Sequence, residues 1–458
     1  MRRTLVLNVV GLTPNLVGEH TPNLAALARD GAQRPLRTIE PAVTCSVQST
    51  FTTGLPPRDH GCVANGWYYR DTAEVALWRQ SNALVTGEKI WDAAKKRDPA
   101  FTCAKLFWWF NMYSTADYAV TPRPQYPADG RKVPDVHTHP AELRDELQAE
   151  LGTFPLFKFW GPAADVTCSS WIARCAARVW ERQKPTLSLV YLPHLDYNLQ
   201  RLGPRHPDIS QDLRAIDALC GDLIEQARKD DAAVIVLSEY GITEVNGAIP
   251  LNQVLRRAGL LAVRREEAGE QLDAGASEAF AVVDHQLAHV YVKRRHRIGE
   301  VQRLLQGLAG VDAVWGEDEK RAHGLDHPRS GELVAVSARD RWFSYPFWLD
   351  DALAPDYART VDIHRKPGYD PVELFLDPAL AMPKLKIAST LLRRKLGFRA
   401  LLDVIPFDTS LVKGSHGRLT DTPDEGPVFI TSDPSRLPPG DTIAATEVKE
   451  TVLAHLFP

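Results

Sequence analysis

The chain has 458 residues, of which 44% are hydrophobic and 24% are charged. This composition is that of an ordinary globular protein, and it excludes a disordered chain and a collagen-like repeat. The 54 basic and 58 acidic side chains give a net charge of −4. Because the sequence has no long basic block, its charge pattern favours neither a nucleic acid polymer nor a membrane as the partner.

Six cysteines are dispersed along the sequence without a CxxC pair, which is typical of a reduced protein and indicates a cytoplasmic location. A short apolar run at 5–12 follows Arg2 and Arg3 and is similar to a signal-peptide core. However, Asn8 interrupts this run, and no small-x-small cleavage site follows it. No run approaches the roughly 18 apolar residues that span a bilayer.

The first elements are predicted to be a strand, a loop and a helix. Residues 4–10 are apolar and rich in β-branched side chains, which is typical of a strand. Thr21 and Pro22 then provide the cap and the first position of a helix that we expect to end at Gly31. Further strands are predicted at 186–192, 232–237, 289–293 and 332–337, and an amphipathic helix carries Leu213, Ile216, Leu219 and Leu223 on one face.

Strands that alternate with helices indicate an α/β fold, in which a mostly parallel central sheet has helices on both faces. Ligands of such sheets bind at the carboxyl ends of the strands. The polar residues that follow the predicted strands are therefore candidates for a site, namely 8–13, Thr44, 194–200 and 238–243.

Two stretches do not follow this alternation. Residues 67–185 are rich in aromatic side chains and proline, and residues 340–413 combine tryptophans with a basic helix around 393–395. We expect a single domain over 1–458, with a cap-like insertion at 67–185 and a second insertion at 340–413. The aromatic run at 107–110 has two interpretations, since it can stack on a flat ligand or pack in a core or cap.

Acidic and imidazole side chains collect after several predicted strands. They are His194 with Asp196, Glu239, Asp284 with His285, Asp326 with His327, Asp362 with His364, and His416. Carboxylates and imidazoles that converge are the ligands that Zn²⁺ or Mn²⁺ requires. For any one pair a helix cap or a surface histidine is the commoner explanation, but several pairs in one chain weaken that explanation. These residues alone indicate a candidate metallohydrolase.

Several motifs resemble those of the nucleotide pyrophosphatase/phosphodiesterase family of the alkaline phosphatase superfamily. The segments 41–46, 53–61 and 65–68 resemble the region of that family around its nucleophile. The remaining similar segments are 5–12 with 21–24 for the first strand and helix, 237–245 for the Ser-Asp-His-Gly-Met-Thr-x-Val signature, and 414–417 for the last metal-ligand motif.

The resemblance implies roles for individual residues. Thr44 would be the nucleophile that takes the phosphoryl group covalently, and Asn65 would donate its amide to a phosphate oxygen. Asp196 and His416 match metal ligands of the family. Cys45 is an alternative nucleophile, although a small buried cysteine at a helix start is the more ordinary interpretation.

The sequence also departs from the ligand pattern of the family. Val10 stands where the family has a metal-binding Asp, and Gln200 stands where it has a His. Glu239 and Tyr240 replace an Asp-His pair. Three outcomes stay open, namely a metal site rebuilt with other residues, a site with one metal, and a site with none. Residues that would rebuild the site are His194, Asp362 and His364, with Asp284, His285 and His327 as further candidates.

The resemblance therefore implies a hydrolase of phosphodiester or pyrophosphate bonds that depends on a divalent metal, with zinc expected and manganese as the alternative. A small-molecule phosphoester would be its partner, and Arg329 and Lys366 are candidates to bind the phosphate. The alternatives are a phosphoryl or other group transferase on the same site and a degenerate protein that binds phosphoesters without turnover. The oligomeric state stays open.

Overall fold

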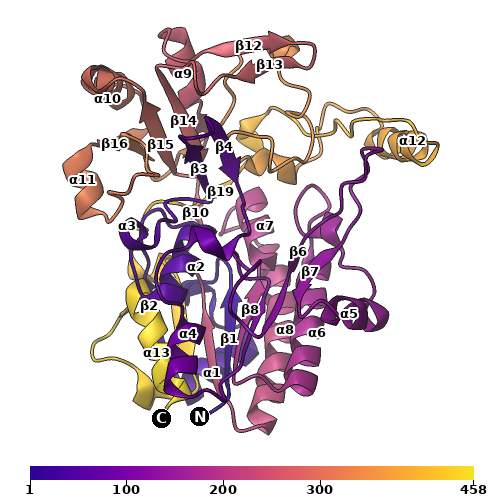
Figure 1. The fold of residues 1–458 in the computed structure, drawn as a ribbon, viewed down its shortest axis with the longest axis vertical. Helices are drawn as coiled ribbons and strands as arrows, with labels where there is room; N and C mark the ends of the chain where they lie inside the picture. The colour runs from indigo at the N-terminus through magenta and orange to yellow at the C-terminus, as the bar shows by residue number, and fades with distance from the viewer.

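A nine-stranded sheet forms the base of the molecule in the computed structural model, which describes residues 1–458 (Figure 1). The strand order is β21-β2-β20-β9-β1-β8-β5-β6-β7. The strands are β1 Thr4–Val9, β2 Ala32–Arg37, β5 Cys103–Leu106, β6 Tyr118–Pro122, β7 Val136–His139, β8 Leu187–Leu192, β9 Ala233–Leu237, β20 Val428–Thr431 and β21 Ile443–Ala444.

The centre of the sheet is parallel. Strand β1 pairs with β8 on one side and with β9 on the other, and every residue of these three strands is buried. Buried parallel strands read as continuous apolar runs, which is why the sequence predicted all three within one residue at each end. Antiparallel pairing enters at β20 and at β7. The predicted α/β class with a mostly parallel sheet is confirmed.

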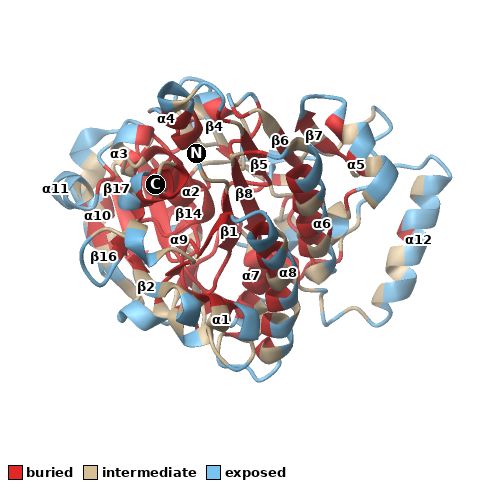
Figure 2. Ribbon diagram, turned by 90° about the horizontal axis from the view of Figure 1, so that it is seen from below, coloured by how far each residue is buried: buried red, intermediate tan, exposed pale blue.

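Helices lie on both faces of the sheet (Figures 1 and 2). The helix predicted from Pro22 to Gly31 is α1, and the predicted amphipathic helix is α8. One face carries α1 Pro22–Asp30, α6 Val166–Gln183, α7 His194–Leu202 and α8 Ile209–Lys229, and the other carries α2 Thr44–Thr53, α4 Ile90–Arg97 and α13 Val448–Leu456. None of the helices combines the length and the apolar character needed to cross a bilayer.

A second sheet, which is antiparallel, lies above the first in Figure 1. Two predicted strands belong to it rather than to the central sheet, because residues 285–286 form a tight turn that pairs β14 with β15. Local antiparallel pairing of this kind needs no crossover helix. Its strands, in order, are β14 Ala279–Asp284, β15 Leu287–Val292, β17 Leu333–Ser337 and β16 Val311–Trp315, and the helices beside it are α9 Leu251–Arg257 and α10 Ile298–Gln306.

Residues 67–185 do not form the predicted cap, because much of this stretch belongs to the central sheet and its helical cover. This stretch supplies β5, β6 and β7 to the central sheet and α6 to its cover. The aromatic side chains that suggested a cap are largely core residues, since the Phe107 ring lies 5.0 Å from Phe154 and 5.9 Å from Trp171. The many aromatic residues of this stretch therefore belong to a packed core layer beneath α6 and not to a lid.

Residues 340–413 are mostly irregular chain around two elements. These are β18 Trp342–Phe343 and α12 Pro383–Lys395, and α12 is the predicted basic helix. Trp342, Val404, Ile405 and Val412 build a small separate core here. Helix α12 projects from the side of the molecule (Figures 1 and 2).

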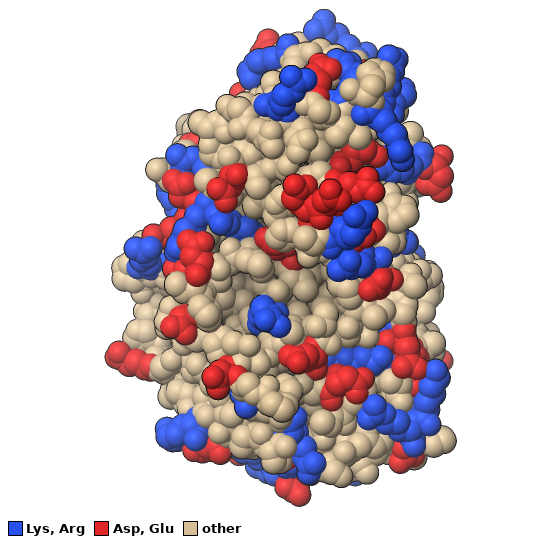
Figure 3. Space-filling view, turned by 90° about the vertical axis from the view of Figure 1, so that its left-hand side faces the viewer, with Lys and Arg blue, Asp and Glu red and all other residues tan.

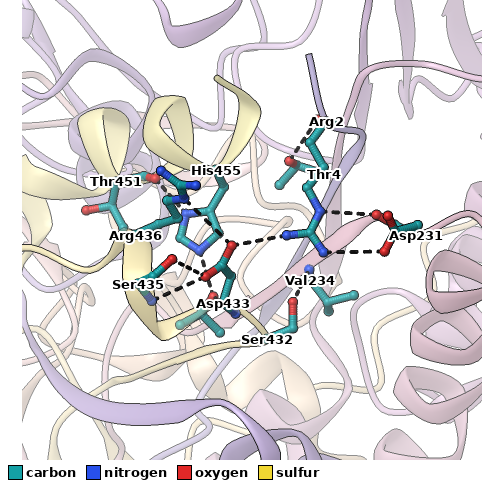
Figure 4. Close-up of polar contacts among 11 residues, drawn as sticks. Arg2, Thr4, Asp231, Val234, Ser432, Asp433, Ser435, Arg436, Thr451 and His455 are labelled. Atoms are coloured by element: carbon teal, nitrogen blue, oxygen red, sulfur yellow. Dashed lines mark hydrogen bonds and ion pairs between the residues drawn. The ribbon is translucent and has the colours of Figure 1, made fainter. Parts of the chain in front are cut away.

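The chain ends are held together at the foot of the central sheet (Figure 4). Arg2 Nη1 lies 3.1 Å from Asp433 Oδ2, and Arg2 Nε donates to the carbonyl of Asp231. On α13, His455 forms hydrogen bonds with Thr431 Oγ1 at 2.7 Å and with the carbonyl of Thr451 at 2.8 Å. These contacts fix the C-terminal helix on the sheet, at the end opposite the candidate site.

Candidate active site

Four segments that lie far apart in the sequence bring polar side chains to the carboxyl end of the central sheet. Thr44 is the first residue of α2, and Asp196 lies in the first turn of α7, which directly follows β8. Glu239 and Tyr240 follow β9, and His416 follows the short strand β19 Gly414–Ser415. All five side chains are buried. The sequence predicted the convergence of Thr44, Asp196 and 239–240, because parallel strands end at the same edge, whereas β19 lies outside the central sheet.

A chain of hydrogen bonds starts at Thr44. Its Oγ1 lies 3.4 Å from the hydroxyl of Tyr240, which donates to Asp196 Oδ1 at 3.1 Å. Asp196 Oδ2 accepts from Gln200 Nε2 at 2.7 Å, and Gln200 Oε1 accepts from the hydroxyl of Tyr369 at 3.1 Å. Two of the residues that depart from the family pattern, Tyr240 and Gln200, therefore occupy both oxygens of Asp196.

Glu239 is held by two side-chain amides. Its Oε1 accepts from Asn8 Nδ2 and from Gln48 Nε2, each at 2.6 Å. Gln48 Oε1 in turn accepts from the backbone N–H of Trp109. Glu239 Oε2 is buried and has no hydrogen-bond partner. Burial raises the pKa of Glu239 to about 7, although the hydrogen bonds from Gln48 and Asn8 oppose this shift.

Four rings form a stacked column beside Thr44. Tyr240 stacks on His416 with the ring centres 3.5 Å apart, His416 packs on His285 at 3.7 Å, and His285 stacks on Tyr369 at 3.6 Å. Burial lowers the pKa of both histidines well below the usual range. The Nδ1 of His416 donates to the carbonyl of Ala42 at 2.8 Å, and its Nε2 lies 3.9 Å from Asp196 Oδ1 without a hydrogen bond.

Asn65 connects the start of α2 to Asp284. Its Oδ1 accepts from the backbone N–H of Cys45, and its Nδ2 and backbone N–H donate to the two oxygens of Asp284, at 3.0 and 2.7 Å. Burial raises the pKa of Asp284 to about 6, and it also raises the pKa of the Cys45 thiol. A buried thiol that stays protonated is a poor nucleophile, so Thr44 is the better candidate of the two.

Asp284 and His285 join the site, whereas His194 does not. His194 Nε2 lies 3.0 Å from Asp212 Oδ1 on α8, outside hydrogen-bond geometry. The prediction that His194 joins Asp196 at the site requires residues 194–196 to be extended, because both side chains then lie on one side. The segment is instead the start of α7, where residues two positions apart point in directions about 200° apart. That prediction is wrong for this reason.

The other two residues proposed to rebuild a metal site make contacts elsewhere. The Asp362 backbone donates to Glu373, and His364 Nδ1 lies 3.4 Å from the carbonyl of Leu77. Only Ile363, which lies between them, lines the cavity at Thr44. The predicted convergence of Asp362 and His364 with Asp196 is therefore absent.

The two predicted phosphate-binding cations have structural partners. Arg329 Nη1 donates to the carbonyls of Gly61 and Leu84, and the guanidinium lies over the ring of Trp67. Lys366 Nζ is buried between Asp370 at 2.7 Å and Glu373 at 2.8 Å. Both basic side chains thus have partners within the protein, and neither lines the cavity at Thr44.

Thr44 faces a cavity of about 70 Å³ that is enclosed mainly by aromatic rings. No lysine or arginine lines it. Its ring-bearing residues are Trp78, Trp109, Phe159, Trp160, Tyr191, Tyr197, Tyr240, His285 and Tyr369, and Asp196 is its only carboxylate. Most of the residues that line the cavity were not predicted from the sequence, and neither was Gln48. The only sequence feature that indicates Gln48 is its position, because it lies one helical turn after Thr44 and thus on the same face of α2.

The residues at this site do not fit the divalent metal cluster that the resemblance implies. No group of three or more His, Cys, Asp or Glu side chains is arranged to hold a metal ion. Val10 is apolar and fully buried where a carboxylate is expected, and both oxygens of Asp196 accept hydrogen bonds from neutral groups. The predicted set of Asp196, Glu239, His416, His194, Asp362 and His364 therefore does not form a metal centre.

The fold is that of the alkaline phosphatase-like proteins. Phosphonoacetate hydrolase from Sinorhizobium meliloti 1021, solved with phosphonoacetate, matches with a TM-score of 0.62 and 15% identity over 99% of this chain and 96% of its own. Murine ectonucleotide pyrophosphatase/phosphodiesterase 5, in an inactive form with AMP, matches with a TM-score of 0.59 and 13% identity over 100% of this chain and 95% of its own.

The chain belongs to the type I phosphodiesterase/nucleotide pyrophosphatase family, whose sequence profile matches residues 4–370. This is a family of hydrolases, and the predicted resemblance is confirmed. An uncharacterised pyrophosphatase/phosphodiesterase of Schizosaccharomyces pombe is 27% identical over 233 residues, which are 48% of this chain. The match spans 41% of the length of that relative.

Proposed function

We propose that the chain hydrolyses a phosphodiester or pyrophosphate bond of a small molecule, with Thr44 as the attacking group. One observation carries most weight, namely the Thr44 hydroxyl at the start of α2, buried and open to a cavity. A helix N-terminus favours an anionic phosphoryl group, because the first backbone N–H groups point toward it. Family membership supports the same reaction class.

The groups around Thr44 suggest how its proton is removed. Glu239 Oε2 is a buried carboxylate oxygen without a partner, and the amides of Asn8 and Gln48 orient the carboxylate through its other oxygen. Glu239 would accept the Thr44 proton as the oxygen attacks phosphorus and the ester oxygen leaves. The second substituent would stay on phosphorus, and water would then cleave the bond between the Thr44 oxygen and phosphorus to release the phosphate monoester. No step is assigned to a zinc or manganese ion, because the ligand set does not fit one.

A second candidate is a protein that binds a phosphoester without turnover. The observation that favours it is the saturation of Asp196 by Tyr240 and Gln200, since a site with few free polar groups has little to stabilise a transition state. No contact favours the transferase alternative.

The first prediction separates these candidates. Thr44→Ala should abolish cleavage of an aryl phosphodiester and leave the circular dichroism spectrum and melting temperature close to those of the wild type, whereas Thr44→Ser should keep part of the activity because it keeps the hydroxyl. Mass spectrometry of acid-quenched wild type should detect the phosphoryl group with its remaining aryl ester on Thr44. An alanine variant as active as the wild type would refute the nucleophile. An inactive wild type that still binds the ester would favour the second candidate.

A further inference from the structure

Helix α12 presents an apolar stripe to solvent. It projects from the molecule at the edge of the second insertion (Figures 1 and 2). Leu385, Leu392 and Leu396 are 61%, 57% and 66% exposed. Their spacing of seven and four residues places them on one face of a helix. Three leucines that remain in water on one face are unusual for a soluble surface.

The opposite face attaches α12 to the protein. Ile387 packs against the small core around Trp342 and Ile405, and Thr390 is buried. Arg394 Nε donates to the carbonyl of Ala400, which folds the following loop back on this side. A surface helix normally buries its apolar stripe and exposes its polar side. Helix α12 has the reverse arrangement.

Basic side chains border the leucine stripe on both sides. At 100° per residue, Lys384 and Lys395 lie along one border and Lys386 and Arg393 along the other. Only Lys386 has an acidic partner, Asp403 at 2.9 Å. The sequence from 378 to 402 contains no Asp or Glu.

The loop after the helix continues the same pattern. Phe398 is 62% exposed, and Arg399 follows it. By contrast, the face of the molecule in Figure 3, which is turned away from α12, has Lys and Arg interspersed with Asp and Glu. The region around α12 therefore differs from that face, because basic side chains gather around its exposed leucines without acidic side chains between them.

We propose that residues 382–401, the α12 segment, bind the surface of an anionic phospholipid bilayer. The leucines and Phe398 would lie at the boundary of headgroups and acyl chains, and the lysines and arginines would contact the phosphates. Neither part alone defines this partner. Leucines do not suit a nucleic acid, which is bound by stacking and phosphate contacts, and six basic residues without an acid do not suit an ordinary apolar interface.

The basic charge of the α12 segment reverses the expectation that the protein has no membrane partner. The net charge of −4 gave no reason to expect a membrane partner, but a total over 458 residues conceals a local excess of basic residues. The α12 segment is also separate from the residues assigned to catalysis. The proposed membrane binding can therefore be wrong while the proposed hydrolase activity is right, and the reverse.

Vesicle sedimentation tests the proposal. The full chain should bind phosphatidylcholine vesicles with about 30% phosphatidylglycerol at least about tenfold more strongly than pure phosphatidylcholine, and added salt should weaken the binding. Leu385→Ser/Leu392→Ser/Leu396→Ser should remove the binding. Arg393→Gln/Lys395→Gln should weaken it about tenfold. The matched control Leu349→Ser/Leu419→Ser, at exposed leucines elsewhere, should bind like the wild type.

A fluorescence measurement locates the contact. All six native cysteines are buried and unpaired, so a Leu392→Cys variant can be labelled selectively with a polarity-sensitive dye. Its emission should shift to the blue with the anionic vesicles, and that of a labelled Leu419→Cys control should not. Equal binding to both vesicle types, or binding unaffected by the triple serine variant, would overturn the proposal. So would triple-variant-sensitive binding to a single-stranded oligonucleotide, or triple-variant-sensitive dimerisation, without vesicle binding.

Discussion

Tyr240 is the residue at which the chemistry of this site differs most from the family pattern. A histidine there would offer a nitrogen lone pair to a metal, but the phenol hydroxyl donates a hydrogen bond to Asp196 and its ring stacks on His416. Val10 removes a carboxylate from the same region. Buried, neutral hydrogen-bond donors thus replace the positive charge that would otherwise balance Asp196 and Glu239.

The second prediction concerns this replacement. The wild type should hold fewer than two tightly bound divalent metals per chain, and Val10→Asp/Tyr240→His should raise the zinc content measured by mass spectrometry. The variant should melt at a lower temperature than the wild type in chelator, because the introduced carboxylate is then buried without a partner, and zinc should raise its melting temperature. Val10→Asn/Tyr240→His is the control without the added charge. Two tightly bound metals in the wild type would contradict this interpretation.

Helix α7 and strand β5 show how an element decides what a side chain can do. In α7, helical geometry turns His194 toward Asp212 while Asp196 points into the site. In β5, the strand is buried, so Lys105 places its ammonium group in the interior. Its Nζ donates to the carbonyl of Phe110 at 2.8 Å and lies 4.9 Å from the ring centre of Trp91.

The third prediction follows from Lys105. Burial lowers its pKa from 10.5 to about 7. Between these values the unfolded chain binds a proton that the folded chain does not, so stability should rise as the pH increases from about 7 toward 10.5. Lys105→Met should flatten this rise and increase the free energy of unfolding at pH 7 by about 2 kcal/mol. Asn82 still donates to the Phe110 carbonyl in that variant.

Urea unfolding of both proteins at a series of pH values measures the effect. Lys95→Met is the matched control, because Lys95 is a partly exposed lysine of α4 that pairs with Asp117. An identical pH slope in the wild type and in Lys105→Met would show that Lys105 keeps its proton in the folded protein.

At the scale of the whole molecule, the candidate site lies where two separately packed bodies meet. The central sheet has one large apolar core, and the antiparallel sheet above it has another. Thr44, Asp196 and Tyr240 reach the cavity from the first, and His285 and Tyr369 reach it from the second. A ligand in the cavity therefore contacts both bodies and should stabilise them together.

The fourth prediction tests this arrangement. In the Thr44→Ala background, a saturating aryl phosphodiester should raise the melting temperature, with a stabilisation of about 2.7 kcal/mol at a concentration about one hundred times its Kd. Inorganic phosphate should give a smaller shift, because aromatic rings and no basic side chains line the cavity. Trp109→Ala should reduce the shift from the ester. Equal shifts from phosphate and ester would show that the rings do not recognise the ligand.

The sequence alone determined the three parallel strands at the centre of the large sheet and the first group of site residues. Buried parallel strands have continuous apolar runs, and helix α1 has a proline at its start and a glycine at its end, so β1, β8, β9 and α1 were predicted closely. The motifs around Thr44, Asp196 and Glu239 identified the family, whose profile matches residues 4–370, and the motif at His416 lies outside that match. Because parallel strands end at one edge, the topology of the central sheet brought Thr44, Asp196 and Glu239 together, whereas His416 reaches them from β19, outside that sheet.

Only the tertiary structure decided which side chains complete the site and which do not. His194, Asp362, Arg329 and Lys366 carry suitable chemical groups, but the helix phase of α7 and nearby buried partners direct them elsewhere. Asn8, Gln48 and Tyr369 are ordinary in sequence and become part of the site through long-range contacts. A side chain's orientation depends on what packs around it, and residues far apart in the chain supply most of that packing.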